Sequence, residues 1–157
     1  MKAIFECKSL FHCRVEKLFQ FHEEPIGFET LVGLDKTVQV TLAPKSISEI
    51  GTKAVLEVNI FPFIKTSWIA EHIYFEKNKK FIDIQRKGPF KYFCHEHRFE
   101  ERGEYSLLND HIEFEFYFNP IAKYFINQKL SSQFINRHAA TANYLQIKYE
   151  NQFCGLV

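Results

Sequence analysis

His95 and His97 are the residues of this chain best suited to proton or metal chemistry, because imidazole binds either near neutral pH. They lie two residues apart in an alternating segment, so both side chains leave the same face of a strand. They could bind a metal with Asp83 or Asp110 as a third ligand, or orient a carbonyl or hydroxyl group of a ligand. Hydrogen bonding within the protein explains them best, since buried polar groups are nearly always paired. Because no third ligand follows at a fixed local spacing, we expect neither a metal nor another cofactor.

Asp110 is the clearest candidate for a buried charge. The residues of the same parity along its strand are apolar and those of the opposite parity are mostly polar: Leu108, Ile112, Phe114, Phe116 and Phe118 against Asn109, His111, Glu113, Glu115 and Tyr117. Asp110 is therefore predicted to point inward, where an unpaired carboxylate is costly, and to pair with His95, His97 or Arg98. A role as acid or base requires a raised pKa and a substrate within reach, and a structural ion pair explains the residue equally well.

Asp83 and Gln85 share one face of their strand, but the sequence leaves open which face that is. If Ile82 and Ile84 point toward the core, Asp83 and Gln85 are solvated. If Phe81 points inward, both polar residues join the histidines instead. A register shift of one residue exchanges the two faces.

These residues belong to a chain that alternates between strand and helix patterns. Period-two alternation predicts strands over residues 3–11, 37–42, 53–61, 64–76, 81–86, 92–101 and 105–118. Helical spacing over residues 15–21 and 26–32 predicts two short helices between the first two strands. Asn119 and Pro120 predict the start of a long helix that runs to about Leu145, with apolar residues every fourth position. After Gln146 we expect a tail.

The predicted fold class is therefore α+β, with a bent seven-stranded antiparallel sheet around a long C-terminal helix. No linker or repeat interrupts the chain, so residues 1–157 should form one domain. Such a sheet leaves a space between itself and the helix. Aromatic residues make up 17% of the chain, with 18 Phe, and they could line that space or fill it.

Composition excludes several classes of partner. The net charge of +1 gives no field that attracts nucleic acid, and no segment approaches the length of a membrane helix, so we expect no membrane insertion. Four dispersed cysteines and an N-terminus without an apolar leader predict reduced thiols and a cytoplasmic protein. Exposed strand edges are compatible with a monomer or a homodimer.

The order of elements resembles the helix-grip fold of the START-like superfamily, also called SRPBCC. That superfamily includes lipid-transfer domains, plant pathogenesis-related allergens and polyketide cyclases. The motifs are similar to those of a bacterial subgroup of small SRPBCC proteins: Trp68, Phe81-x-Asp83-x-Gln85-x-x-Gly88-Pro89-Phe90, His95-x-His97-x-Phe99, Asp110, Pro120 and Phe134-x-x-Arg137-His138. The resemblance implies the fold and favours an inward polar network with Asp83 and Gln85. It supplies no catalytic set, because members of the superfamily bind or transform many different molecules.

The first functional hypothesis is the binding of a small hydrophobic molecule, lipid-like, aromatic or polyketide-like, between sheet and helix. The predicted ligand-binding residues are Trp68, Asp83, Gln85, Phe90, His95, His97, Asp110, Phe114, Phe116, Ile126, Leu130 and Phe134. A second hypothesis is a cyclase, dehydratase or isomerase in which His95 or His97 exchanges protons and Asp110 sets the tautomer. A third is a protein-interaction module whose core is filled by its own side chains.

Overall fold

The structure is a computed structural model that describes residues 2–61, 64–117 and 120–157, with side chains described for 2–59, 65–117 and 123–157. The chain forms the strands and helices β1 (Ala3–Phe11), α1 (Val15–Glu23), α2 (Pro25–Val32), β2 (Gln39–Leu42), β3 (Lys53–Phe61), β4 (Ile64–Glu76), β5 (Lys80–Lys87), β6 (Tyr92–Arg102), β7 (Tyr105–Glu115), α3 (Pro120–Leu145) and β8 (Tyr149–Leu156).

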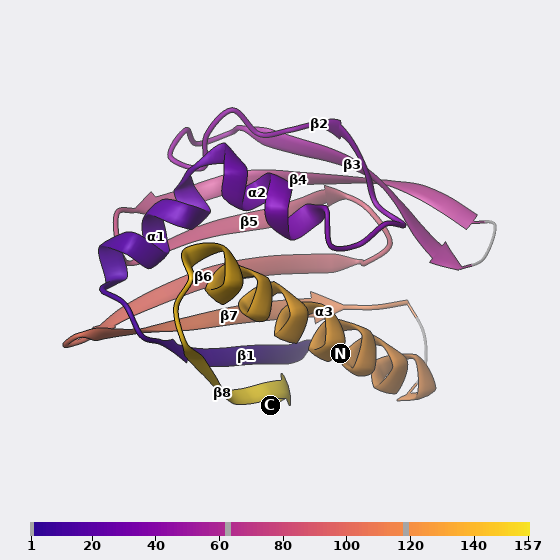
Figure 1. Ribbon diagram of the computed structural model, residues 1–157. Helices are drawn as coiled ribbons and strands as arrows, with labels where there is room; N and C mark the ends of the chain where they lie inside the picture. Colours follow the sequence, from indigo (N-terminus) through magenta and orange to yellow (C-terminus); the bar gives the residue numbers. More distant parts are fainter. Residues whose placement is uncertain (1, 62–63, 118–119) are drawn as a thin grey trace.

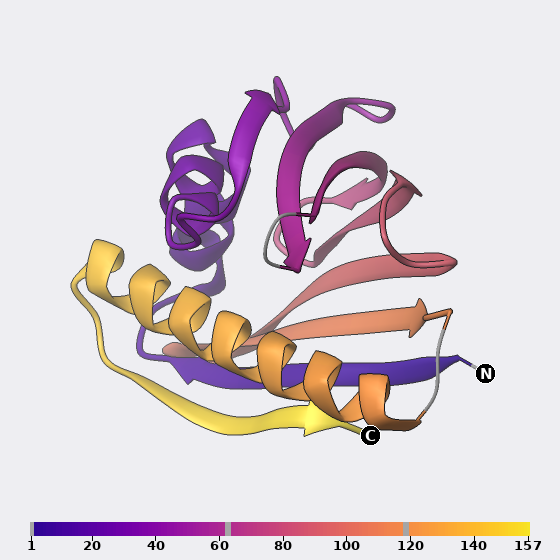
Figure 2. The same ribbon diagram turned by 90° about the vertical axis from the view of Figure 1, so that its right-hand side faces the viewer.

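All strands of the described residues join one antiparallel sheet of eight strands in the order β2-β3-β4-β5-β6-β7-β1-β8. The sheet is strongly curved, and α1, α2 and α3 all lie on its concave side (Figures 1 and 2). The long helix α3 crosses that side diagonally, and the chain then returns along the sheet as β8. This architecture confirms the predicted α+β helix-grip fold with two short helices between the first two strands.

The structure differs from the sequence prediction at the ends of several elements. The segment after Gln146 is a strand, β8, which pairs with β1 and makes the sheet one strand larger than the seven expected. The strand β2 begins at Gln39 because Thr37 is held in a turn, where its backbone N–H and its hydroxyl both donate to Asp35 Oδ1. The strand β7 ends at Glu115. The predicted N-cap Asn119 lies outside the described residues.

Two apolar clusters fill the space between sheet and helices. The α1 cluster lies under α1 and the C-terminal half of α3, and its buried members are Phe11, Cys13, Val15, Leu18, Phe19, Ile47, Phe81, Phe99, Leu108 and Ala142. The Trp68 cluster lies under the N-terminal half of α3. Its buried members are Ala3, Phe5, Cys7, Phe93, Ile112, Phe114, Leu130 and Phe134, and its partly buried members include Trp68, Phe90 and Ile126.

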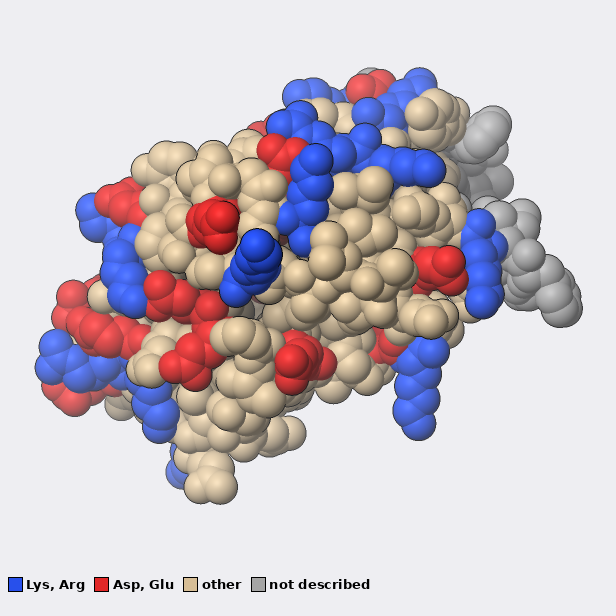
Figure 3. Space-filling view, turned by 90° about the horizontal axis from the view of Figure 1, so that it is seen from above, with Lys and Arg blue, Asp and Glu red and all other residues tan. Residues whose placement is uncertain are grey.

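The outer surface carries charge of both signs. Figure 3 shows acidic and basic side chains interspersed on the face seen from above, in keeping with the net charge of +1. No helix in the described part of the chain combines the length and apolar composition that a membrane span requires.

Candidate functional site

The register of the sheet gathers the predicted polar residues on its concave face. In one row across the strands, Ile112 pairs with His95, His95 with Asp83, and Asp83 with His72. In the next row, Asp110 pairs with His97, and His97 pairs with Phe81. Directly paired residues of an antiparallel ladder point to the same side, so these rows set the polar side chains next to one another.

Asp110 is the centre of a buried hydrogen-bond network. Its Oδ1 accepts from His95 Nε2 at 2.8 Å and from His97 Nδ1 at 3.0 Å. Its Oδ2 accepts from His138 Nε2 at 2.7 Å. The second carboxylate, Asp83, accepts from His97 Nε2 at 3.2 Å through Oδ2. Asp83 therefore points inward, which resolves the ambiguity in the sequence.

Both ring nitrogens of His97 face a carboxylate, so both carry a proton and His97 is an imidazolium. Burial alone would lower its pKa, but the hydrogen bonds to Asp110 and Asp83 outweigh burial and raise the pKa above its ordinary value. The ring also stacks on Phe81, with 4.0 Å between centroids, which places the cation against an aromatic face.

The two carboxylates are ionised in spite of their burial. Burial raises the pKa of Asp83, but the His97 hydrogen bond and the nearby imidazoles outweigh it and lower the pKa to about 2. Burial likewise opposes ionisation of Asp110, but hydrogen bonds from His138, His95 and His97 hold its pKa well below the usual range. Burial and the charge of His97 lower the pKa of His95 to about 4, so His95 is neutral near pH 7.

His138 and Ser9 belong to this network, although neither was among the predicted site residues. Ser9 Oγ lies 2.7 Å from His138 Nδ1 and can donate to it, and Asn151 Nδ2 donates to Ser9 Oγ at 3.1 Å. The order serine–imidazole–carboxylate is that of a nucleophilic triad, but Ser9 is fully buried. A substrate cannot reach this hydroxyl in the present conformation, so the chain of bonds is structural.

Arg98 was a third predicted partner of Asp110, and this prediction is wrong. Arg98 has the opposite parity to His97, and its Nε donates to Glu96 Oε2 at 2.8 Å. The arginine therefore lies on the convex face, away from the network.

The predicted apolar residues form one connected group beside the network. Ring contacts join Trp68 to Phe90 and Phe93, and Phe90 in turn contacts Phe114 and Phe116, with centroids 5.0 to 5.7 Å apart. Ile126, Leu130 and Phe134 cover the group from α3. The Phe134 ring also lies 5.3 Å from the ring of His95, so the apolar group touches the polar network directly.

Gln85 points inward but does not join the imidazoles. Its Nε2 donates to Phe90 O at 2.8 Å, and its Oε1 accepts from Phe90 N at 3.3 Å. The side chain thus closes the loop after β5 and fixes Phe90 against Trp68. A Cβ atom at Gly88 would lie 2.3 Å from Gln85 Oε1, so a larger residue there would displace the Gln85 side chain from its bonds to Phe90.

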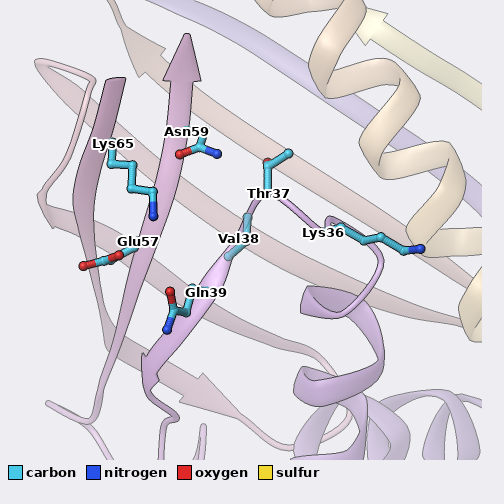
Figure 4. A pocket seen from close by; sticks show the side chains of 7 residues that line it. All are labelled: Lys36, Thr37, Val38, Gln39, Glu57, Asn59 and Lys65. Carbon is cyan, nitrogen blue, oxygen red and sulfur yellow. The ribbon is translucent and has the colours of Figure 1, made fainter. Parts of the chain in front are cut away.

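One pocket formed by described residues lies elsewhere. It has a volume of about 130 Å³, and its lining residues are Lys36, Thr37, Val38, Gln39, Glu57, Asn59 and Lys65. These side chains come from β2, the segment before it, β3 and β4 (Figure 4). The pocket contains none of the predicted ligand-binding residues, and its volume is below the roughly 300 Å³ at which small-molecule sites begin.

Comparison with solved structures gives matches over nearly the whole chain. The crystal structure of Ara h 8.0201 has a TM-score of 0.69 at 12% identity, and the match covers 93% of this chain and 99% of that one. Norcoclaurine synthase from Thalictrum flavum, in complex with dopamine and hydroxybenzaldehyde, has a TM-score of 0.68 at 9% identity, covering 93% and 87%. The Zhui aromatase/cyclase from Streptomyces sp. R1128 has a TM-score of 0.62 at 9% identity, covering 92% of each chain.

The chain shares the helix-grip fold of these proteins. No family model and no curated protein matches the sequence. At these identities the similarity shows a shared fold and not a shared chemistry.

Proposed function

We propose that this protein binds a small hydrophobic molecule, lipid-like, aromatic or polyketide-like, between the sheet and the N-terminal half of α3. One observation carries the proposal: the Trp68 cluster contains large apolar side chains that remain partly buried on the concave side of the sheet. Trp68, Phe90 and Ile126 pack against its buried core, yet each keeps some exposure to solvent. A ligand that covered them would gain about 25 cal/mol for each Å² of apolar surface removed from water, before ordering costs.

The polar network supports the same location. The His95 ring contacts Phe134, and Asp110 and His97 fix that ring from the other side. A hydrophobic site with a few fixed polar groups is typical of sites that orient a small molecule. The network would therefore face the polar end of a ligand whose apolar part lies against Trp68 and Phe90.

The similar structures support this class of ligand. One norcoclaurine synthase structure is a complex with dopamine and hydroxybenzaldehyde, which are small aromatic molecules with polar groups. Another similar structure is an aromatase/cyclase. These proteins share the fold at low identity, so they support a binding site of this kind without indicating the ligand.

The hydrogen bonds of His95 and His97 favour ligand binding over catalytic proton exchange. Proton exchange needs a ring nitrogen within hydrogen-bond reach of the substrate. Both nitrogens of His97 are held by Asp83 and Asp110, and His95 Nε2 is held by Asp110. Three of the four ring nitrogens of His95 and His97 are thus committed to hydrogen bonds within the protein in the present conformation, and His95 Nδ1 is the exception.

Titration with decanoic acid, monitored by the emission of the single Trp68, tests the proposal. We expect a saturable change in emission, because Trp68 contacts the rings that the acid would cover. The variant Ile126→Phe should block the proposed binding site. Phenylalanine is used rather than tryptophan because a second Trp would add its own emission to that of Trp68. The variant adds bulk at the partly buried face of α3 and should weaken binding about tenfold or more, as overpacking costs about 1–3 kcal/mol.

The matched control is Ile135→Phe, because Ile135 lies on the same helix but is 40% exposed. This variant should bind decanoic acid as the natural chain does. An unchanged Trp68 emission with decanoic acid and with hydroxybenzaldehyde alike, in a protein that native mass spectrometry shows to be free of bound molecules, would contradict ligand binding. It would instead favour a core filled by its own side chains.

A further inference from the structure

Asp83, His95 and His97 bring three potential metal ligands together on the concave face. Their ligand atoms all lie within 4.8 Å of one another. Asp83 Oδ2 is 3.2 Å from His97 Nε2 and 3.8 Å from His95 Nδ1. At 3.8 Å the second contact is too long for a hydrogen bond.

The spacing of these atoms suits a first-row transition metal. Bonds of about 2.0–2.2 Å to nitrogen and oxygen in a tetrahedral site place neighbouring ligand atoms about 3.3–3.5 Å apart. The observed 3.2 and 3.8 Å fall on either side of that spacing, so side-chain shifts of a few tenths of an ångström would bring these pairs to it. Two imidazoles and one carboxylate on one side of an ion also leave a position open.

Asp110 provides the outer support that such a site needs. Histidines that bind a metal nearly always donate their other N–H to a carboxylate, a carbonyl or water, which fixes the ring and its tautomer. His95 Nε2 and His97 Nδ1 both donate to Asp110 Oδ1, at 2.8 and 3.0 Å. The nitrogens that remain, His95 Nδ1 and His97 Nε2, are the ones that lie toward Asp83.

His72 is a second, independent indication. It is only 8% exposed, yet its Nδ1 has no hydrogen-bond partner in the described structure. The register pairs His72 directly with Asp83, so both side chains leave the same face of neighbouring strands. A buried imidazole nitrogen without a partner on the strand beside Asp83 requires a polar partner, which a bound ion or its water would supply.

We propose that Asp83, His95 and His97 bind one divalent first-row transition-metal ion of the Zn²⁺ class, with His72 on the strand beside Asp83. On binding, the proton on His97 Nε2 leaves to solvent and its lone pair binds the ion, while Nδ1–H stays on Asp110. The charges of Asp83 and Asp110 then balance that of the ion. The ion enters past the Asp83 side chain, because this side chain is 16% exposed and is the most exposed of the three ligands.

Calorimetric titration of the metal-free protein with Zn²⁺ alone tests this site, with Co²⁺ as a spectroscopic probe of the ligand geometry. We expect saturation at one equivalent and a rise in the unfolding temperature, because an ion that binds the folded state stabilises it. Asp83→Asn and His97→Gln should each weaken binding about 100-fold or more, since each removes a ligand. Asp110→Asn should weaken Zn²⁺ binding about 10- to 100-fold, because Asp110 orients both imidazole rings.

The matched control is His111→Gln. His111 also contacts a carboxylate, with Nδ1 2.9 Å from Glu6 Oε1, but it has the opposite parity to Asp110 and lies on the convex face. It should bind Zn²⁺ as the natural chain does. If the natural chain shows no saturable Zn²⁺ binding, or if folded Asp83→Asn and His97→Gln bind as tightly as His111→Gln, the site is disproved. Because decanoic acid is absent, this result is independent of the proposed ligand binding.

Discussion

The α1 cluster and the Trp68 cluster are built from the same kind of residue, but they are covered differently. Phe19 of α1 is fully buried, and its ring contacts Phe75, Phe81 and Phe99. Trp68 and Phe90 make equally close ring contacts, yet both remain partly exposed. Two helices, α1 and α3, contribute residues to the first cluster, whereas α3 is the one helix that contributes to the second among the described residues.

Because of this difference, the α1 cluster mainly stabilises the fold, whereas the Trp68 cluster keeps apolar surface on which a ligand could bind. Full burial at the α1 cluster gives the largest transfer free energy, and it leaves no surface for another molecule. Partial burial at the Trp68 cluster contributes less to stability and keeps apolar surface available. The Asp–His network lies between the two clusters and touches both, through Phe81 on one side and Phe134 on the other.

Truncation of one ring in the α1 cluster and of one ring that packs on the Trp68 cluster should give the largest contrast. Phe19→Ala should lower the free energy of unfolding by about 4 kcal/mol, because it removes a fully buried ring and leaves a cavity. Phe116→Ala should cost only about 1–2 kcal/mol, because Phe116 is partly exposed and its ring packs against that of Phe90. Urea unfolding of both variants measures the two values. Equal costs would mean that the Trp68 cluster is packed as tightly as the α1 cluster.

The network itself should be the next most sensitive region. Asp110→Asn should cost about 3 kcal/mol, because it removes the charge that balances a buried imidazolium and keeps only one acceptor oxygen for three imidazoles. The control is Glu113→Gln on the same strand, whose side chain is 38% exposed and which should change stability by less than about 0.5 kcal/mol. Urea denaturation near pH 7 measures the free energy of unfolding of both variants. A cost below about 1 kcal/mol for Asp110→Asn would show that the network is solvated rather than buried.

Most of this network could be predicted from local patterns. The parity of Asp110 predicted that it points inward, and the spacing of His95 and His97 predicted their shared face. His138 was missed, although it lies four residues after Phe134 and eight after Leu130, on the same side of α3. That spacing is the signal that could have placed it. Its contacts with Ser9 and Asp110 depend on how α3 crosses the sheet, which no local pattern specifies.

The strand β8 was missed for a different physical reason. Its first residues are largely exposed on both faces, so the burial pattern lacks the alternation that marks a half-buried strand. It forms because β1 offers an unpaired edge and the chain returns from α3 beside that edge. Pairing of this kind depends on tertiary position rather than on side-chain periodicity.

Acid should destabilise the protein through its buried neutral histidines. Burial, partly offset by the hydrogen bond to Leu18 O, lowers the pKa of His22 from 6.5 to about 3. The unfolded chain therefore binds a proton at His22 below about pH 6.5, while the folded chain does not, so stability falls as pH drops from 6.5 toward 3. Replacement of His22 by Gln should remove up to about 1.4 kcal/mol per pH unit from this slope.

The control for this slope is Phe21→Leu, next to His22 in α1. It should lower stability at every pH without changing the slope, because leucine does not titrate. His97 acts in the opposite direction: its raised pKa stabilises the folded state at low pH, and this contribution is lost as pH rises through the folded pKa. Urea unfolding at several pH values separates these effects, and an unchanged slope in His22→Gln would contradict the assignment.

The smallest expected effect concerns the loop that holds Phe90 at the edge of the Trp68 cluster. Gln85→Ala should cost about 1–2 kcal/mol, because it removes the two hydrogen bonds to the Phe90 backbone. Gly88→Ala should cost a similar amount, since its Cβ would lie 2.3 Å from Gln85 Oε1 and displace that side chain. If both act through the same bonds, Gly88→Ala should cost little once Gln85 is already alanine. Additive costs in the double variant would mean that Gly88 is required for the backbone of the loop rather than for Gln85. The emission of Trp68, which contacts Phe90, should report the loosened loop in either single variant.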